Sequence, residues 1–160
     1  MLLGRDQVRL NETLASTLNP SGNLVYSVDL LEYEHVAAVV ADAVNRIGRL
    51  DGLINCAGIS TTLPVNAISN DKMEHFFQTN VIGPINITRQ FIRKNHISGS
   101  GGSVIFISSV MAVVGEKGKM IYSTTKGALV SAVRSLAIEL ASRKIRVNAV
   151  SPGVVESPMS

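Results

Sequence analysis

The sequence predicts an α/β fold in which helices are wound on both faces of a parallel sheet. Short apolar runs bounded by turn residues alternate with longer stretches of helical spacing, and this alternation is typical of βαβ units. The apolar runs are mostly aliphatic or β-branched, as in strands that are covered on both faces. The expected strands are residues 23–28, 53–56, 104–107 and 145–150, with residues 1–3 as the end of another.

Three helices are expected between these strands. Residues 32–47 carry apolar side chains at helical spacing. Asp29 precedes them and Glu32 follows three residues later, which indicates that Asp29 caps this helix. Residues 71–94 and 122–142 have the same apolar periodicity and complete the set.

Pro84 interrupts the pattern of the second helix. Proline has no amide hydrogen, so the Asn80 carbonyl four residues earlier loses its usual partner. We therefore expect a kink at residues 80–84, with the carbonyl directed at a water molecule near Lys126. The alternative is that Gly83 ends one helix and Pro84 begins the next.

Composition and charge exclude several classes of protein. The 160 residues are 46% hydrophobic, which excludes intrinsic disorder and suffices for one domain with a substantial core. The net charge is only +3, and the basic residues are scattered without interleaved aromatics, so no nucleic-acid partner is expected. No apolar run reaches the roughly 18 residues of a membrane span, and the first residues lead us to expect no signal peptide. We expect a soluble cytoplasmic protein without a membrane partner.

No metal site is expected. Cys56 is the single cysteine, which excludes a disulfide framework and a cysteine-based zinc site. We expect its side chain to pack as a small apolar group. His35, His75 and His96 have no partners at metal-ligand spacing, and we interpret all three as surface residues.

Ser109, Tyr122 and Lys126 form the combination that points to chemistry. Tyr122 and Lys126 are four residues apart at the start of a helix and share one face. Ser109 follows the expected strand 104–107, at the sheet edge where ligand crevices of open α/β folds form. An ammonium group stabilises a nearby phenolate, and a serine hydroxyl can bond a substrate oxygen. These groups suit proton transfer to or from a carbonyl/alcohol pair, and the accompanying hydride requires a nicotinamide cofactor.

The chain resembles the short-chain dehydrogenase/reductase family over essentially its whole length. The resemblance rests on the order and spacing of Asn55-Cys56-Ala57-Gly58, Asn80, Ser109, Tyr122 to Lys126, and Pro152-Gly153. Residues 145–159 are most similar to the β-ketoacyl carrier-protein reductase branch. The resemblance implies a Rossmann-like fold and an NAD(P)-dependent oxidoreductase acting on a small-molecule carbonyl or alcohol.

The resemblance also implies roles for individual residues. Tyr122 would be the general acid/base, and Lys126 would hold the nicotinamide ribose and favour the tyrosinate. Ser109 would orient the substrate carbonyl, and Asn80 would hold a water that relays protons to Lys126. Ser108 is expected to point away from the site, because successive strand residues alternate.

The same resemblance implies a set of cofactor contacts. Tyr122 and Lys126 belong to it, together with Asp29, Asn55, Ala57, Gly58, Pro152, Gly153, Val155 and Ser157. Arg5 would lie at the end of the family's second strand, where the 2′ position of the cofactor is recognised. An arginine there favours NADP. The next residue is Asp6, and because an acidic residue at this position favours NAD, NAD remains an alternative cofactor.

Two parts of the family pattern have no counterpart in this sequence. These are the first strand with its Gly-rich turn, and the C-terminal lid with the last strand. Residues 1–160 are therefore expected to form a single incomplete domain. Because the first strand lies in mid-sheet, a slot about two strand spacings wide should separate residues 1–3 from residues 53–56.

The resemblance implies a homo-oligomer, a tetramer for the full-length parent. Helices 71–94 and 122–142 would form the interface, where the small residues Gly127, Ala128 and Ser131 permit close approach. The alternative to an enzyme is a catalytically inactive truncated fragment that acts only by association.

Overall fold

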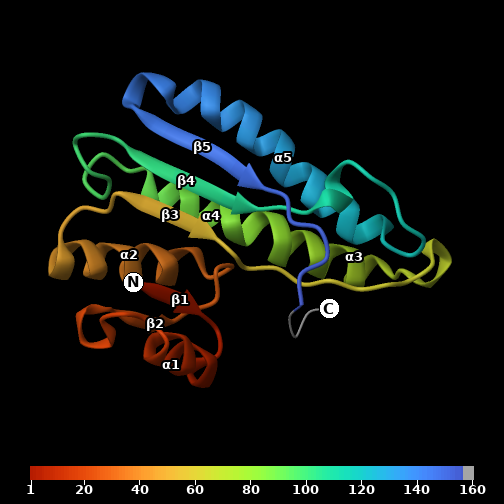
Figure 1. Ribbon diagram of the computed structural model, residues 1–160, viewed down its shortest axis with the longest axis horizontal. Helices are drawn as coiled ribbons and strands as arrows, with labels where there is room; N and C mark the ends of the chain where they lie inside the picture. The colour runs from red at the N-terminus through yellow and green to blue at the C-terminus, as the bar shows by residue number, and fades with distance from the viewer. Residues whose placement is uncertain (157–160) are drawn as a thin grey trace.

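A computed structural model describes residues 1–156 of the chain and confirms the parallel-sheet α/β fold (Figure 1). Within these residues the strands form two separate parallel sheets. The smaller sheet pairs β1 with β2, and the larger has the order β3-β4-β5. The strands are β1 (Leu2–Gly4), β2 (Val25–Ser27), β3 (Gly52–Asn55), β4 (Gly102–Ile107) and β5 (Ile145–Val150).

The helices connect successive strands. The α-helices are α1 (Gln7–Ala15), α2 (Tyr33–Ile47), α3 (Asn70–Phe77), α4 (Gly83–Phe91) and α5 (Met120–Leu140). A π-helical segment, η3 (Gln78–Ile82), joins α3 to α4. Short 3₁₀ turns are η1 (Pro20–Gly22), η2 (Val65–Ala67), η4 (Val110–Ala112) and η5 (Ala141–Arg143).

The larger sheet buries one face against helices. Alternate residues Val104 and Phe106 of β4 pack with Phe91 of α4 and Leu129 of α5. The residues between them point to the other face, as the two-residue period of a strand requires. On that face, the side chain of Ile54 is 61% exposed. The expectation that the strands are covered on both faces is thus wrong for the larger sheet, whereas the smaller sheet packs against α1 and, through Leu3 and Tyr26, against the core formed by α2.

A groove separates the two sheets, as the predicted slot requires. β1 pairs only with β2, and β3 only with β4, among the described strands. The space between them has a volume of about 570 Å³ and is lined by Leu2 and Leu3 on one side and by Leu53 and Ile54 on the other. Cys56 also lines this groove and is exposed, so the expectation that its side chain packs as a small apolar group is wrong.

Two helix predictions need correction at their N-termini. Asp29 does not cap α2, because its Oδ1 accepts from the Leu31 amide at 2.9 Å, inside the turn that precedes the helix. The N-cap position belongs to Glu32, whose side chain makes no cap bond. Helix α1 was not predicted, because its sequence is largely polar and buries only Leu10.

Around Pro84 the chain neither breaks nor simply kinks. It remains helical through η3, where the Gly83 amide bonds the Gln78 carbonyl five residues earlier. Pro84 then occupies the first turn of α4, where a missing amide hydrogen costs little. A widened π turn is thus how the helix accommodates the proline.

Replacing Gly101 with alanine should destabilise the fold. Gly101 has φ +104°, and a Cβ there would stand 2.2 Å from the Lys144 carbonyl oxygen. The strained backbone alone costs about 1–3 kcal/mol, so we expect the melting temperature to fall by roughly 5 °C or more. Thermal unfolding followed by circular dichroism measures this.

Gly115→Ala is the matched control for this substitution. A Cβ at Gly115 meets nothing within 4 Å, and a surface change of this kind alters stability by less than about 0.5 kcal/mol. Equal melting temperatures for the two variants would contradict the steric account of the turn before β4.

Candidate active site

Tyr122 and Lys126 face one another at the start of α5. The helix begins at Met120, so the two residues lie one turn apart near its N-terminus. The Lys126 Nζ lies 5.7 Å from the centroid of the Tyr122 ring. The predicted common face of the two side chains is therefore present, with the ammonium over the aromatic ring.

Lys126 is a buried cation with a backbone acceptor. Only 4% of the residue is exposed, and its Nζ donates to the Ile107 carbonyl at 2.8 Å. Burial lowers the pKa of Lys126 because it disfavours the charged form, and the nearby Cys56 sulfur partly offsets this. Partial burial in turn raises the pKa of the Cys56 thiol, which the Lys126 charge partly counteracts.

Ser109 lies just past the end of β4, as predicted. Its backbone is extended, and its Oγ accepts from the Met111 amide at 3.2 Å, which begins the η4 turn. Because that bond uses an oxygen lone pair, the hydroxyl hydrogen remains available for donation. One cavity of about 490 Å³ is lined by Ser109, Tyr122 and Lys126. We call it the second cavity, because another cavity, described below as the first, lies earlier along the chain.

The Asn80 side chain is fully engaged in holding the neighbouring loop. Its Oδ1 accepts from the Ile59 amide at 2.7 Å, and its Nδ2 donates to the Ile59 carbonyl at 3.0 Å. The same Nδ2 donates to Thr125 Oγ1 at 3.0 Å. Asn80 is completely buried in the π-helical segment. The Asn80 amide group therefore joins η3 to the loop after β3 and to α5 by hydrogen bonds.

Gly58 brings Asn80 and Lys126 close together. A Cβ at Gly58 would stand 3.3 Å from Lys126 Nζ and 3.4 Å from Asn80 Oδ1. Asn80 therefore does not point away from Lys126, which the predicted proton relay requires. The absence of a side chain at Gly58 is what leaves room for both groups.

The residues predicted to contact a cofactor lie around two cavities that share Gly58. The first cavity, of about 190 Å³, lies between the ends of β1, β2 and β3, and the second reaches from Tyr122 to the chain after β5. The predicted residues on the first are Arg5, Asp29, Ala57 and Gly58, and those on the second are Gly58, Tyr122, Lys126, Pro152, Gly153 and Val155. The two cavities therefore adjoin at Gly58.

Of the predicted cofactor residues that the structure describes, Asn55 lines neither cavity. Asn55 is buried, and its Nδ2 donates to Thr88 Oγ1 at 3.2 Å, which ties β3 to α4. That contact agrees with a role in supporting the sheet. Ser157 lies outside the described residues.

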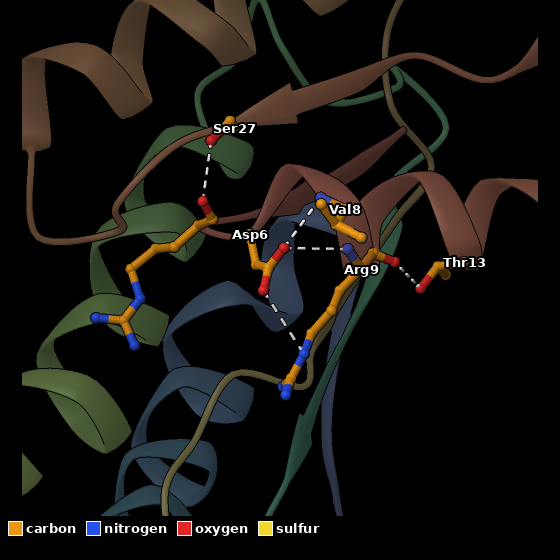
Figure 2. A network of polar contacts seen from close by, with 6 residues as sticks. Asp6, Val8, Arg9, Thr13 and Ser27 are labelled. Atoms are coloured by element: carbon orange, nitrogen blue, oxygen red, sulfur yellow. Dashed lines mark hydrogen bonds and ion pairs between the residues drawn. The ribbon is translucent and has the colours of Figure 1, made fainter.

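Arg5 and Asp6 have different surroundings although they are adjacent. Arg5 Nη1 lies 3.8 Å from Asp29 Oδ2 at the first cavity. Asp6 is the N-cap of α1, and its Oδ1 accepts from the amides of Val8 and Arg9 at 2.9 and 3.1 Å. Its Oδ2 lies 3.6 Å from Arg9 Nε, and Figure 2 shows the carboxylate turned toward these two residues.

Sequence reasoning missed the two hydroxyl groups that fix the start of α5. Thr125 is completely buried and its Oγ1 links the Asn80 amide to the Tyr122 carbonyl, the latter at 2.8 Å. Ser108 Oγ donates to the Lys126 carbonyl at 3.0 Å. Hydroxyl side chains that bond helix carbonyls are a known alternative to capping, and a threonine inside the predicted helix was the available signal.

No metal-binding cluster of His, Cys, Asp or Glu occurs among residues 1–156. The interpretation of His96 as a surface residue is wrong, since it is 4% exposed and its Nδ1 lies 2.8 Å from the Gln90 carbonyl.

Among residues 1–156, none of the helices has both the length and the apolar character of a membrane span.

Lys126→Met should remove a pH dependence of stability. Burial places the pKa of Lys126 in the folded chain below its unfolded value of 10.5. The unfolded chain therefore binds more protons between these two values, and the free energy of unfolding rises with pH across that interval. Methionine has no such titration, so the rise should be smaller in the variant.

Urea unfolding at a series of pH values up to about 10.5 measures this difference. Lys117→Met, at an exposed position, is the control and should leave the pH profile as in the unaltered chain. A Lys126→Met profile that rises as steeply as the control would contradict the burial of a titrating ammonium.

The chain matches the family model for short chain dehydrogenases over residues 1–160. It is 34% identical to glucose and ribitol dehydrogenase homolog 2 of Arabidopsis thaliana, over 98% of this chain and 55% of that protein. It is 32% identical to the 3-oxoacyl-[acyl-carrier-protein] reductase FabG of Thermotoga maritima, over 84% of this chain and 54% of that protein. The chain thus spans about half the length of these curated relatives.

Solved structures show the same likeness. A short-chain dehydrogenase from Streptomyces avermitilis superposes with a TM-score of 0.87 at 29% identity, over 99% of this chain and 57% of the other. ElxO with NADP bound superposes with a TM-score of 0.88 at 25% identity, over 98% and 63%. Motifs, fold and site geometry agree with these matches, and the chain belongs to the short-chain dehydrogenase family.

Proposed function

We propose that this chain carries the catalytic core of an NAD(P)-dependent oxidoreductase that interconverts a carbonyl and an alcohol by hydride transfer. The observation that carries the proposal is the second cavity, which Ser109, Tyr122 and Lys126 line together. The relatives named dehydrogenase and reductase support the same reaction class. The substrate is a small-molecule carbonyl or alcohol.

In the proposed mechanism the side chains handle the substrate oxygen and its proton. The Ser109 hydroxyl, held by the Met111 amide, donates to the carbonyl oxygen and orients it. Tyr122 gives its phenolic proton to that oxygen during reduction, as a general acid. The Lys126 ammonium over the ring stabilises the phenolate that remains. In oxidation the same groups act in reverse.

Asn80 is proposed to complete the proton path through its backbone. Because both amide hydrogens and one lone pair of Oδ1 are engaged with Ile59 and Thr125, we assign the water molecule to the backbone carbonyl. This carbonyl lies in the π-helical segment, where Pro84 denies it the usual amide partner. The water would connect Lys126 with solvent and return the proton to Tyr122.

The two cavities fit a dinucleotide, and we propose NADP. When bound, the nicotinamide supplies the hydride chemistry that no side chain has. Arg5, Asp29, Asn55 and Ala57 would hold or support the adenosine side, with Arg5 on the 2′-phosphate. Asp6 is committed to capping α1, which disfavours NAD, because an acidic residue must be free to accept from the ribose hydroxyls. Gly58, Pro152, Gly153, Val155 and Ser157 would flank the nicotinamide side with Tyr122 and Lys126.

For the whole protein we propose a cytoplasmic homo-tetramer that contains this incomplete domain. Helix α5 carries the small residues Gly127 and Ala128, which are half-buried, and Ser131, which is exposed. Such residues permit the close approach of a second helix. The competing function is a catalytically inactive fragment that acts only by association, and the cofactor-binding and turnover measurements below distinguish the two.

Arg5→Ala should weaken NADPH binding about 10- to 100-fold, because a charge-assisted bond to phosphate contributes about 1.5–3 kcal/mol. NADH affinity should hardly change, since NADH lacks that phosphate. Fluorescence titration of this chain with each nucleotide measures both constants. Arg9→Ala is the control, because Arg9 pairs with Asp6 and is 81% exposed. Equal losses for the two nucleotides, or no binding of either by the unaltered chain, would contradict the proposed cofactor site.

Tyr122→Phe in the full-length protein should lower kcat by at least about 10²-fold, because it removes the general acid and keeps the ring. Cofactor affinity should stay nearly constant, whereas Lys126→Ala should lower both quantities. Steady-state rates and nucleotide titrations of each variant measure this. Tyr33→Phe serves as the control, because Tyr33 lies on α2 beside Arg89 and Arg93 and lines neither cavity. Near-normal turnover in Tyr122→Phe would exclude the proposed role.

A further inference from the structure

Two hydrogen bonds connect Lys126 to consecutive residues at the end of β4. At the tip of the side chain, Nζ donates to the Ile107 carbonyl at 2.8 Å. At the backbone, the Lys126 carbonyl accepts from Ser108 Oγ at 3.0 Å. Both Ser108 and Lys126 are at least nine-tenths buried. The lysine is therefore held at its root and at its tip by one short stretch of chain.

The geometry of the strand end explains why both bonds form. The Ser108 amide donates to the Val150 carbonyl at 2.7 Å, so it faces β5. In a trans peptide the Ile107 carbonyl points the opposite way, toward the β3 side of β4. The pairing of β3 with β4 ends at Asn55 opposite Phe106, so this carbonyl lies beyond the ladder and accepts from the lysine instead.

The lysine side chain consequently passes over the end of β4. Its backbone lies on α5, and its ammonium lies beside Gly58, in the loop that follows β3. A long flexible side chain has many rotamers, and burying it costs roughly 1.5–2 kcal/mol of conformational entropy. When the Lys126 backbone is fixed relative to the carbonyl that its ammonium bonds, fewer side-chain rotamers can reach that carbonyl.

We infer that Ser108 is a positioning residue, which holds α5 in register with the end of β4 so that the Lys126 ammonium stays between the Ile107 carbonyl and the Tyr122 ring. This role rests on the proposed function of Lys126. The bond from Ser108 itself is independent of any nucleotide. Ser108 lines the second cavity together with Ser109, but its hydroxyl hydrogen is donated to the Lys126 carbonyl, whereas the Ser109 hydroxyl hydrogen is left for a ligand.

The test measures how fast the Lys126 amine of this chain reacts in reductive methylation, without nucleotide, by mass spectrometry of its peptide. A net hydrogen bond of about 0.5–1.5 kcal/mol corresponds to roughly a 2- to 10-fold change. We therefore expect Ser108→Ala to speed methylation of Lys126 by about that factor. Lys117 and Lys144 should react as in the unaltered chain. Ser108→Thr, which keeps the hydroxyl, should restore the protection.

Thr124→Val is the matched control. Thr124 Oγ1 donates to the Met120 carbonyl at 2.8 Å, which is also a hydroxyl-to-helix bond on α5, but it is exposed and its acceptor is Met120 rather than Lys126. Its removal should leave Lys126 protected. If Ser108→Ala does not fold, Ser108→Cys, which keeps the size and weakens the donor, replaces it.

Unchanged Lys126 reactivity in the Ser108 variant, equal acceleration at Lys117, or the same acceleration in Thr124→Val would overturn the inference. Because no nucleotide is present, this result is separate from that for the proposed function. A chain that binds no NADPH but exposes Lys126 selectively in Ser108→Ala would reject the cofactor site and keep the positioning role.

Discussion

A buried ammonium group must be given acceptors and neighbours, and much of the candidate site follows from how Lys126 obtains them. Its tip lies at the Ile107 carbonyl, its charge lies over the Tyr122 ring, and the space beside it exists because residue 58 is glycine. Burial alone disfavours the charged form, so each of these contacts helps to keep the cation in place. The end of β4, the start of α5 and the loop after β3 are all fixed relative to this one group.

The surrounding polar groups form a connected network rather than isolated pairs. Asn80 uses both its oxygen and its amide hydrogens to join the loop at Ile59 to Thr125, and Thr125 in turn bonds the Tyr122 carbonyl. Buried polar groups are costly when one partner is missing. A network in which each polar group has a hydrogen-bond partner therefore holds the site rigid. Ser109 is not part of this network, and its hydroxyl hydrogen is left for a ligand.

The groove between β1 and β3 differs from this connected site, because no hydrogen-bond ladder crosses it among the described strands. Each edge of the groove carries strand backbone that no described strand pairs, and its walls are apolar. The first and second cavities lie at the carboxyl ends of the strands on either side of Gly58. The smaller sheet carries Arg5 and Asp29, and the larger carries the catalytic candidates. Packing of α2 against α4 and of Val28 against Ile87 connects the two halves.

The sequence by itself determined the parallel α/β fold and the meeting of Ser109, Tyr122 and Lys126, which follow from local periodicity and from the rule that parallel strands end at one edge. The separation of residues 1–3 from β3 was expected only from the resemblance to the short-chain dehydrogenase family, whose first strand has no counterpart in this sequence. Helix boundaries at Asp29 and Pro84, the burial of His96 and the exposure of Cys56 were decided by tertiary structure. They depend on particular hydrogen bonds and contacts that periodicity does not encode, such as the Leu31 amide on Asp29, the Gln90 carbonyl at His96, and the Leu30 side chain near Gly83.

The same distinction applies to the polar contacts of the site. Spacing on a helix places Tyr122 beside Lys126, because residues four apart share a face whatever surrounds them. No spacing rule brings Ser108 to the Lys126 carbonyl or Asn80 to Thr125, since these pairs are separated by a whole strand, loop or helix. Sequence periodicity determines which residues face the site. Only the packing of α5 against the end of β4 decides which hydroxyl and amide groups find one another there.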